Sequence, residues 1–195
     1  MQRTRIICAF ADVTKFGSYA KIASRDPEAF EKFVRDIYNA FASYRGESEH
    51  FVKYLGDGFL AIATLVQGHN CQLAVKFLCE LHELQDEVNR LIKDLPGFPK
   101  PDGFRVRVAA GQVFKIKVSD GEVDFVGYAM NLAARLLRVC PDVPLICHES
   151  VKDIIGKKDH IVFQKINAHR HTLDGVEQED LHALWAFTCC EPKEG

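Results

Sequence analysis

Two aspartates beside short apolar runs are the first residues of the sequence that could do chemistry together. Asp12 ends the apolar run 6–11, and Asp57 lies in a Gly-Asp-Gly tripeptide, 56–58, between two further apolar runs. If these segments are neighbours in one sheet, the carboxylates converge and repel each other unless a cation neutralises them. Mg²⁺ or Mn²⁺ suits such a pair and leaves positions for water and phosphate. Two ions about 3.5–4 Å apart can activate an attacking oxygen and stabilise a leaving one. The pair therefore predicts a phosphoryl-transfer site, although either aspartate alone is more often a turn residue.

The turn after Asp12 offers a second element. Residues 14–18 contain a glycine and small hydroxyl side chains just before a possible helical turn. Backbone N–H groups there, at Phe16 and Gly17, could cradle a triphosphate. The spacing lacks the lysine and glycine pattern of a P-loop, and an ordinary strand-to-helix turn has the same composition.

Asn131 and Arg135 form the third element. Their spacing of four places them on one face of a helix. An amide suits a sugar oxygen, and a permanently charged guanidinium suits a phosphate. Taken alone, the pair is more typical of a solvated surface.

The elements that must position these residues are visible in the hydrophobic pattern. Helical spacing predicts amphipathic helices from Pro27 and over residues 74–91, and the Asp-Gly sequence predicts a hairpin at Asp57. Further strands are expected at 104–118, 124–127, 145–148, 161–166 and 181–187, and further helices at 129–139 and 149–155. This order predicts an α/β or α+β class, with a ferredoxin-like mixed sheet and helices on one face.

The composition favours one domain spanning residues 1–195, because 195 residues with 47% hydrophobic content support a single sizeable core. With 25 basic and 27 acidic residues, the net charge of -2 gives no overall attraction to nucleic acid or to an anionic membrane. The seven cysteines show no zinc-like spacing, which favours reduced thiols and a cytoplasmic location. We expect a soluble protein, because no apolar run reaches membrane-spanning length.

Three stretches resemble, in order and spacing, the signature motifs of class III adenylate and guanylate cyclases. They are residues 10–16, 52–58 and 124–135. The resemblance runs from about Arg5 to Phe187, and three linked motifs are far more specific than any one. It implies a class III cyclase catalytic fold over nearly the whole chain.

The resemblance also implies roles for individual residues. Asp12 and Asp57, with the backbone carbonyl of Val13, would bind two divalent ions, Mn²⁺ or Mg²⁺. Lys53 and Asp124 fall where adenylate cyclases place their adenine-reading pair.

For Asn131 and Arg135, the resemblance implies orientation of the ribose and stabilisation of charge on the α-phosphate during attack by the 3′-hydroxyl. In such enzymes the metal aspartates come from one subunit and the remaining groups from the other. A homodimer with shared active sites is therefore expected, and a monomer should be inactive.

One position departs from the family pattern. Members usually carry a phosphate-binding lysine before a glycine near the C-terminal strand, and this chain has Asp174 there. The nearby Arg170, His169 or His171 could substitute, although a basic loop is more often solvated surface.

We expect the chain to be a catalytic domain alone, and freestanding cyclases of this size resemble the pyrimidine cyclases of Pycsar antiphage systems. That resemblance favours UTP as substrate and cyclic UMP, over cyclic CMP, as a signal to a downstream effector. Phe51 and Tyr54 could shorten the base pocket, although aromatic residues in strands are usually core. Two alternatives stay open: an adenylate cyclase, supported by Lys53 and Asp124, and an inactive cyclase-like dimer that binds a nucleotide or a protein, supported by Asp174.

Overall fold

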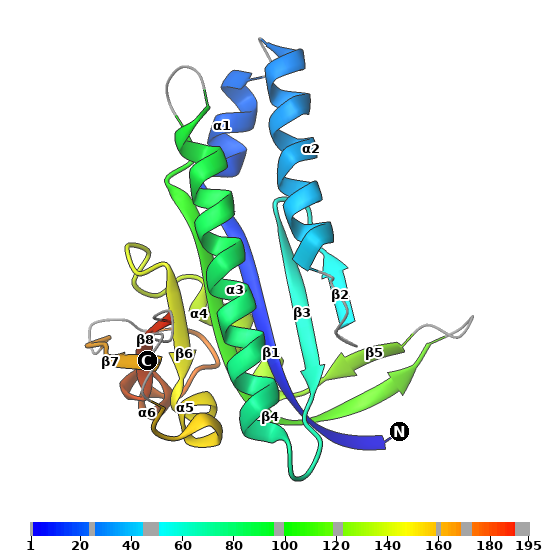
Figure 1. Cartoon of the computed structure of the whole chain (residues 1–195), viewed down its shortest axis with the longest axis vertical. Helices are drawn as coiled ribbons and strands as arrows, with labels where there is room; N and C mark the ends of the chain where they lie inside the picture. The colour runs from blue at the N-terminus through cyan, green and yellow to red at the C-terminus, as the bar shows by residue number, and fades with distance from the viewer. Residues whose placement is uncertain are drawn as a thin grey trace, which may run out of the picture.

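A mixed sheet flanked by helices organises the molecule (Figure 1). The computed structural model describes residues 2–23, 26–44, 51–95, 100–118, 123–158, 161–168 and 173–189. The strands are β1 (Gln2–Thr14), β2 (Phe51–Tyr54), β3 (Gly58–Thr64), β4 (Gly103–Lys117), β5 (Val123–Val126), β6 (Leu145–His148), β7 (Ile161–Lys165) and β8 (Leu184–Cys189). The helices are α1 (Phe16–Ala23), α2 (Pro27–Tyr44), α3 (Asn70–Lys93), α4 (Tyr128–Leu136), α5 (Glu149–Ile155) and α6 (Gln178–His182).

Strand β1 lies in the middle of the sheet. Within the described part of the chain, the strand order is β2-β3-β1-β4-β6-β8-β7, and β5 pairs with the distal half of β4. β1 is antiparallel to both neighbours, whereas β4 and β6 are parallel. The β1 pairing ends with Asp12 opposite Gly58 of β3 and Thr14 opposite Gly103 of β4. This end of β1 therefore brings together the chain segments that carry the candidate metal ligands.

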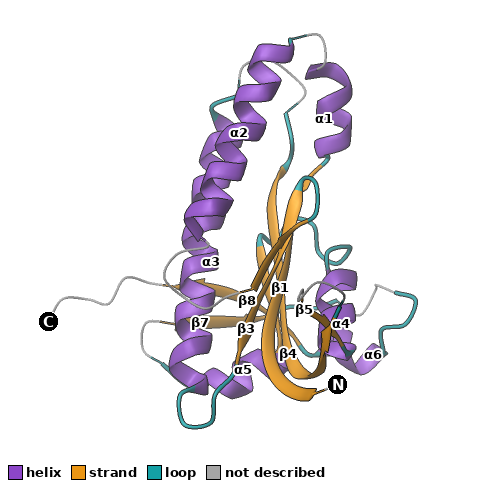
Figure 2. Cartoon of the chain, turned by 90° about the vertical axis from the view of Figure 1, so that its right-hand side faces the viewer, coloured by secondary structure: helices purple, strands orange, loops and turns teal. Residues whose placement is uncertain are grey.

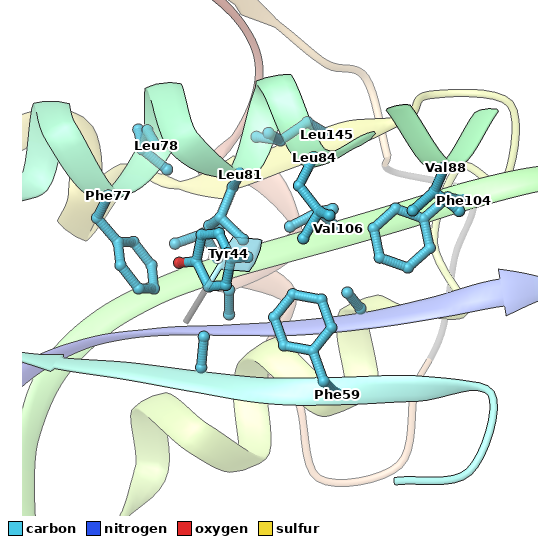
Figure 3. Close-up of a cluster of buried hydrophobic side chains, with 14 of the residues drawn as sticks. Tyr44, Phe59, Phe77, Leu78, Leu81, Leu84, Val88, Phe104, Val106 and Leu145 are labelled. Atoms are coloured by element: carbon cyan, nitrogen blue, oxygen red, sulfur yellow. The ribbon is translucent and has the colours of Figure 1, made fainter. Parts of the chain in front are cut away.

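Both faces of the sheet are covered. Alternate residues of β1 point to opposite sides, so Ile7 and Ala9 join the core under α2, α3 and α5, and Ile6 and Cys8 join the core under α4 and α6. Figure 3 shows the first core, with side chains of α3 such as Leu81 pointing onto the strands. The mixed α+β class is confirmed. The expectation placed helices on one face, whereas α4 and α6 cover the other, as Figure 2 shows for α4. The reason is that β1 is apolar at consecutive positions and needs cover on both sides.

Most predicted elements are found close to their expected ends, with three differences. Asp12 lies inside β1 rather than after it, because pairing with β4 continues to Thr14. α4 ends at Leu136, three residues earlier than expected. The predicted strand 181–187 begins in the short helix α6, which contains Leu181.

Some sequence-based expectations fall outside the described residues. These are the turn at 119–121 and the basic residues His169, Arg170 and His171. Among the described helices, none is both long and apolar enough to cross a bilayer.

Candidate active site

The hairpin between β2 and β3 approaches β1 closely because Gly58 has no side chain. A Cβ atom at Gly58 would lie 1.9 Å from the carbonyl oxygen of Ala11, so only glycine permits this approach. The N–H of Val13 donates to the carbonyl of Asp57 at 3.1 Å and fixes the hairpin tip beside the end of β1. The predicted meeting of Asp57 with the Asp12 segment therefore follows from backbone contacts.

The hairpin tip is also anchored from the other side. Gly56 has φ +78°, a left-handed conformation that favours glycine. Its carbonyl accepts a hydrogen bond of 2.8 Å from the hydroxyl of Tyr38 in α2. The turn that carries Asp57 is thus held between β1 and α2.

The two carboxylates are close enough to influence each other. Burial raises the pKa of Asp57, the charge of Asp12 raises it further, and Arg105 opposes the shift. Arg105 holds Asp12 with a fork, Nε to Oδ1 at 3.2 Å and Nη2 to Oδ2 at 2.9 Å. The guanidinium of Arg105 therefore offsets part of the repulsion between the two carboxylates. Two carboxylates and a strand carbonyl suit a hard divalent cation, so the residues fit the ions that the resemblance implies.

Sequence reasoning did not single out Arg105. The signal was its place in the alternating segment 104–108, which puts Arg105 and Arg107 on one face of a strand. The alternation does not give the register between β1 and β4. That register sets Arg105 opposite Asp12, although the two residues are 93 positions apart in sequence.

The turn between β1 and α1 is tight. Lys15 has φ +62°, and its carbonyl accepts from the N–H groups of Ser18 and Tyr19, both at 3.1 Å. α1 begins immediately afterwards at Phe16, so the N–H groups of Phe16 and Gly17, which have no partner within the helix, follow Asp12 closely in the chain. A Cβ atom at Gly17 would meet nothing within 4 Å, so packing does not require glycine there. The location fits the predicted triphosphate cradle.

A cavity of about 730 Å³ opens beside Arg105, and neither Asp12 nor Asp57 lines it. Its walls include Thr14 and Arg105 from the two paired strands and Arg90 and Lys93 from the end of α3. The lining contains three cationic side chains and three aspartates, Asp86, Asp102 and Asp142, so this cavity has no net charge. A second cavity, of about 480 Å³, is lined by Asp57 together with Phe16 and Gly17 of the predicted triphosphate cradle.

A second group of predicted residues lies on β2 and β5. The Nζ of Lys53 is 3.9 Å from Oδ2 of Asp124, and both side chains are about half exposed. Oδ1 of Asp124 accepts from the N–H of Phe125, whose ring meets that of Phe51 at 5.5 Å. The structure thus brings Lys53, Asp124 and Phe51 together.

Tyr54 does not join this group. Neighbouring residues of a strand point to opposite faces, and the Tyr54 ring lies 5.3 Å from Tyr38 and 6.4 Å from Phe41 on α2. Phe51 and Lys53 point to the same face of β2, whereas Tyr54 points to the opposite face, which packs against α2. The parity of β2 could have shown this from the sequence.

Asn131 and Arg135 lie on the exposed face of α4, while the other face of the helix packs on the sheet. The guanidinium of Arg135 rests against Gly175, where a Cβ atom would come within 3.0 Å of Cζ. Gly175 has φ +70°, so the loop needs glycine for its conformation and for this contact. Its neighbour Asp174, the residue that departs from the family pattern, therefore lies one position from a contact with Arg135.

The structure places the predicted site residues in two separate groups. Among the described residues, no hydrogen bond or ion pair joins Asp12 or Asp57 to Lys53, Asp124 or the α4 pair. Asp57 responds to Asp12 and Arg105, and neither Lys53 nor Arg135 is among the charges that shift its pKa.

Comparison with solved structures identifies the fold. The chain superposes on the adenylyl cyclase CyaB from P. aeruginosa with a TM-score of 0.65 and 16% identity, covering 99% of this chain and 97% of that one. The fold is that of a class III cyclase catalytic domain. The guanylyl cyclase Cya2 gives a TM-score of 0.64 at 14% identity, covering 99% and 96% of the two chains.

The guanylate cyclase domain of RhGC from Catenaria anguillulae, in complex with GTP, gives a TM-score of 0.59 at 16% identity, covering 98% of this chain and all of that one. No protein-family model matches the sequence, and no curated protein sequence matches it either. The likeness is therefore carried by the cyclase fold and by the motif residues placed on it.

Proposed function

We propose that the protein is a nucleotidyl cyclase, which converts a nucleoside triphosphate to a 3′,5′-cyclic nucleotide and pyrophosphate. The observation that carries the proposal is the meeting of Asp12 and Asp57 at the end of β1, beside the first turn of α1, within a cyclase fold. Residues 12 and 57 lie far apart in sequence, and the antiparallel pairing of β1 with β3 is what joins them.

The protein residues would position the reacting groups and stabilise charge, which is the main requirement of phosphoryl transfer. Asp12, Asp57 and the carbonyl of Val13 would hold two divalent ions, which when bound activate the attacking oxygen and stabilise the leaving one. The first turn of α1, at Phe16 and Gly17, would hold the triphosphate through its N–H groups. On α4, Asn131 would orient the ribose and Arg135 would stabilise charge on the α-phosphate.

The active enzyme is proposed to be a homodimer with composite sites. Within one chain the two half-sites make no contact with each other among the described residues. A two-fold axis that places the metal half of one subunit against the α4 half of its partner would complete two sites at once. This arrangement makes the isolated subunit inactive.

Our preferred substrate is UTP, and our preferred role is signal production in a Pycsar antiphage system, with a downstream effector that senses cyclic UMP. The support is the sequence resemblance, together with the position of Phe51 on the same face as Lys53 and Asp124. An aromatic ring there would limit the depth available to a base.

An adenylate cyclase is the second candidate. The Lys53–Asp124 pair offers one donor and one acceptor, which suit the edge of adenine. Both side chains are about half exposed, so the pair could contact the base of either UTP or ATP.

The test is incubation of the purified protein separately with ATP, GTP, CTP and UTP in the presence of Mn²⁺, with product analysis by chromatography and mass spectrometry. We expect cyclic UMP from UTP. Exclusive formation of cyclic AMP would replace the first candidate by the second. Absence of any cyclic product, with Asp57→Ala indistinguishable from wild type, would refute the enzyme proposal and leave the inactive dimer.

A further inference from the structure

Arg107 is a buried cation whose partners are backbone carbonyls. Its side chain is fully buried and has the largest volume of the fully buried side chains in the described residues. Its five N–H donors are all used: Nε donates to Leu136 at 3.1 Å, Nη1 to Val106 at 2.9 Å and Pro144 at 3.0 Å, and Nη2 to Val139 and Cys140, both at 3.0 Å. An arginine offers five donors, so none is left over.

The burial of this charge is unusual because, among the described residues, no carboxylate forms an ion pair with Arg107. Burial lowers the pKa of Arg107 to about 10, and the neighbouring charge of Arg105 adds to the shift, so the group is still protonated at neutral pH. The terminal carbonyls of a helix carry the negative end of its dipole. The end of α4 therefore acts as the counter-charge of Arg107.

The carbonyls that Arg107 binds define the end of α4 and the turn that follows. Leu136 is the last residue of α4 and comes directly after Arg135. Cys140 has φ +44°, a left-handed conformation that is strained for a residue with a side chain. By binding both carbonyls, the guanidinium fixes the last turn of the helix and the strained turn against β4.

The same strand reaches the other half-site. Arg105 and Arg107 are two residues apart in β4 and so point to the same face. Arg105 holds Asp12, and Arg107 holds the end of α4. We propose that Arg107 is a positioning residue, which sets the orientation of Asn131 and Arg135 by clamping α4 to β4. The inference rests on the proposed function, because the catalytic role of α4 is part of it.

The main variant is Arg107→Lys, which keeps the charge but has three donors in place of five. The matched control is Gln85→Met. Gln85 is also a buried polar side chain that donates to a β4 carbonyl, that of Phe104 at 3.2 Å, but it comes from α3 on the opposite face. Arg107→Lys removes hydrogen bonds from β4 to the end of α4 and the turn after it, whereas Gln85→Met removes a hydrogen bond from α3 to β4.

We expect Arg107→Lys to lower kcat by about 10- to 100-fold, because small misplacement of a catalytic group has effects of this size. KM should change by less than about threefold, since the lost interaction belongs to the transition state. Gln85→Met removes a single buried hydrogen bond, so it should lower thermal stability less and keep kcat within about twofold of wild type. Equal kcat values for the two variants would overturn the proposal.

Subunit mixing separates positioning of α4 from a general folding defect. Mixed with Asp57→Ala, the Arg107→Lys chain should recover as much activity as an Asp57→Ala and Arg135→Ala pair, because one composite site then has an intact metal half and an intact α4 half. Mixed with Arg135→Ala it should not recover, since both sites then carry a damaged α4. No recovery in the first mixture, when the reference pair recovers, would show that the defect extends beyond α4 and would contradict the proposal.

Hydrogen–deuterium exchange of the amides of α4 and the following turn tests whether Arg107 holds α4, and it does not depend on catalytic activity. Residues 131–139 should exchange faster in Arg107→Lys than in Gln85→Met. If the wild-type protein cyclises none of the four nucleotides, the proposed function fails, and this measurement still tests the clamp. Equal exchange in the two variants would overturn it.

Discussion

The fork between Arg105 and Asp12 leads to a quantitative prediction for Arg105→Met. The side chains of the two residues are 17% and 28% exposed, so the pair lies between a surface ion pair and a buried one. Surface pairs contribute about 0–1 kcal/mol, and breaking a buried pair costs about 3–5 kcal/mol. We therefore expect a loss of about 2 kcal/mol, because Asp12 is left without its guanidinium beside Asp57. For a domain of this size that corresponds to a fall in Tm of about 4–8 °C.

Mn²⁺ should reverse most of this loss. If Asp12 binds the ion as proposed, the ion competes with Arg105 for this carboxylate in the wild-type protein, whereas in Arg105→Met the carboxylate is available. Release of about 2 kcal/mol of competition corresponds to an affinity for Mn²⁺ higher by more than about tenfold. The ion then stabilises the folded state by mass action and does so more strongly in the variant.

The assay is thermal unfolding of both proteins over a Mn²⁺ titration, without nucleotide. The control is Arg35→Met, which removes an exposed ion pair with Glu31 on α2. It should lower Tm little and leave the response to Mn²⁺ unchanged. If Arg105→Met and wild type show the same Mn²⁺-induced shift in Tm, the carboxylate of Asp12 is not the group that binds the ion, and the reasoning fails.

Three further predictions concern the same sites. An equimolar mixture of Asp57→Ala and Arg135→Ala chains should recover about a quarter of wild-type activity, because about half of the dimers are mixed and each has one intact site; this is measured as cyclic nucleotide formed per subunit, against each variant alone. Gly58→Ala should abolish activity and lower Tm, because its Cβ would overlap the carbonyl of Ala11 at 1.9 Å; a melting curve like that of wild type would contradict the close approach. Asp174→Lys should raise kcat/KM, because it restores a cation beside the triphosphate, and steady-state kinetics with an Asp174→Asn control separates gain of a positive charge from loss of a negative one.

Local patterns predicted the strands and the hairpin that carry Asp57 well. The Asp-Gly hairpin and the apolar runs on either side of it are short-range signals, and they led to β2, β3 and the position of Asp57. The helical spacing from Pro27 gave α2 with the observed start. These features depend on neighbouring residues only, so the sequence contains them.

Features that depend on long-range register or on very short elements were not predicted. The pairing of Arg105 with Asp12 requires the alignment of two strands that are far apart in the chain. The five-residue helix α6 is too short to show a helical period, so Leu181 looked like the start of a strand. The assignment of Tyr54 to the base pocket overlooked the alternation of β2, which turns that ring towards α2.

The charges around the aspartates have a consequence for the order of binding. Without ligands, Arg105 neutralises Asp12, so an approaching divalent ion meets a carboxylate that already has a partner. On the proposed function, an ion that binds this carboxylate would release the guanidinium of Arg105, which could then bind a phosphate. On the proposed function, ion binding therefore strengthens triphosphate binding, and by linkage the triphosphate strengthens ion binding by the same factor. On the same proposal, with Asp174 in place of a lysine, this exchange of partners would supply part of the positive charge that a triphosphate needs.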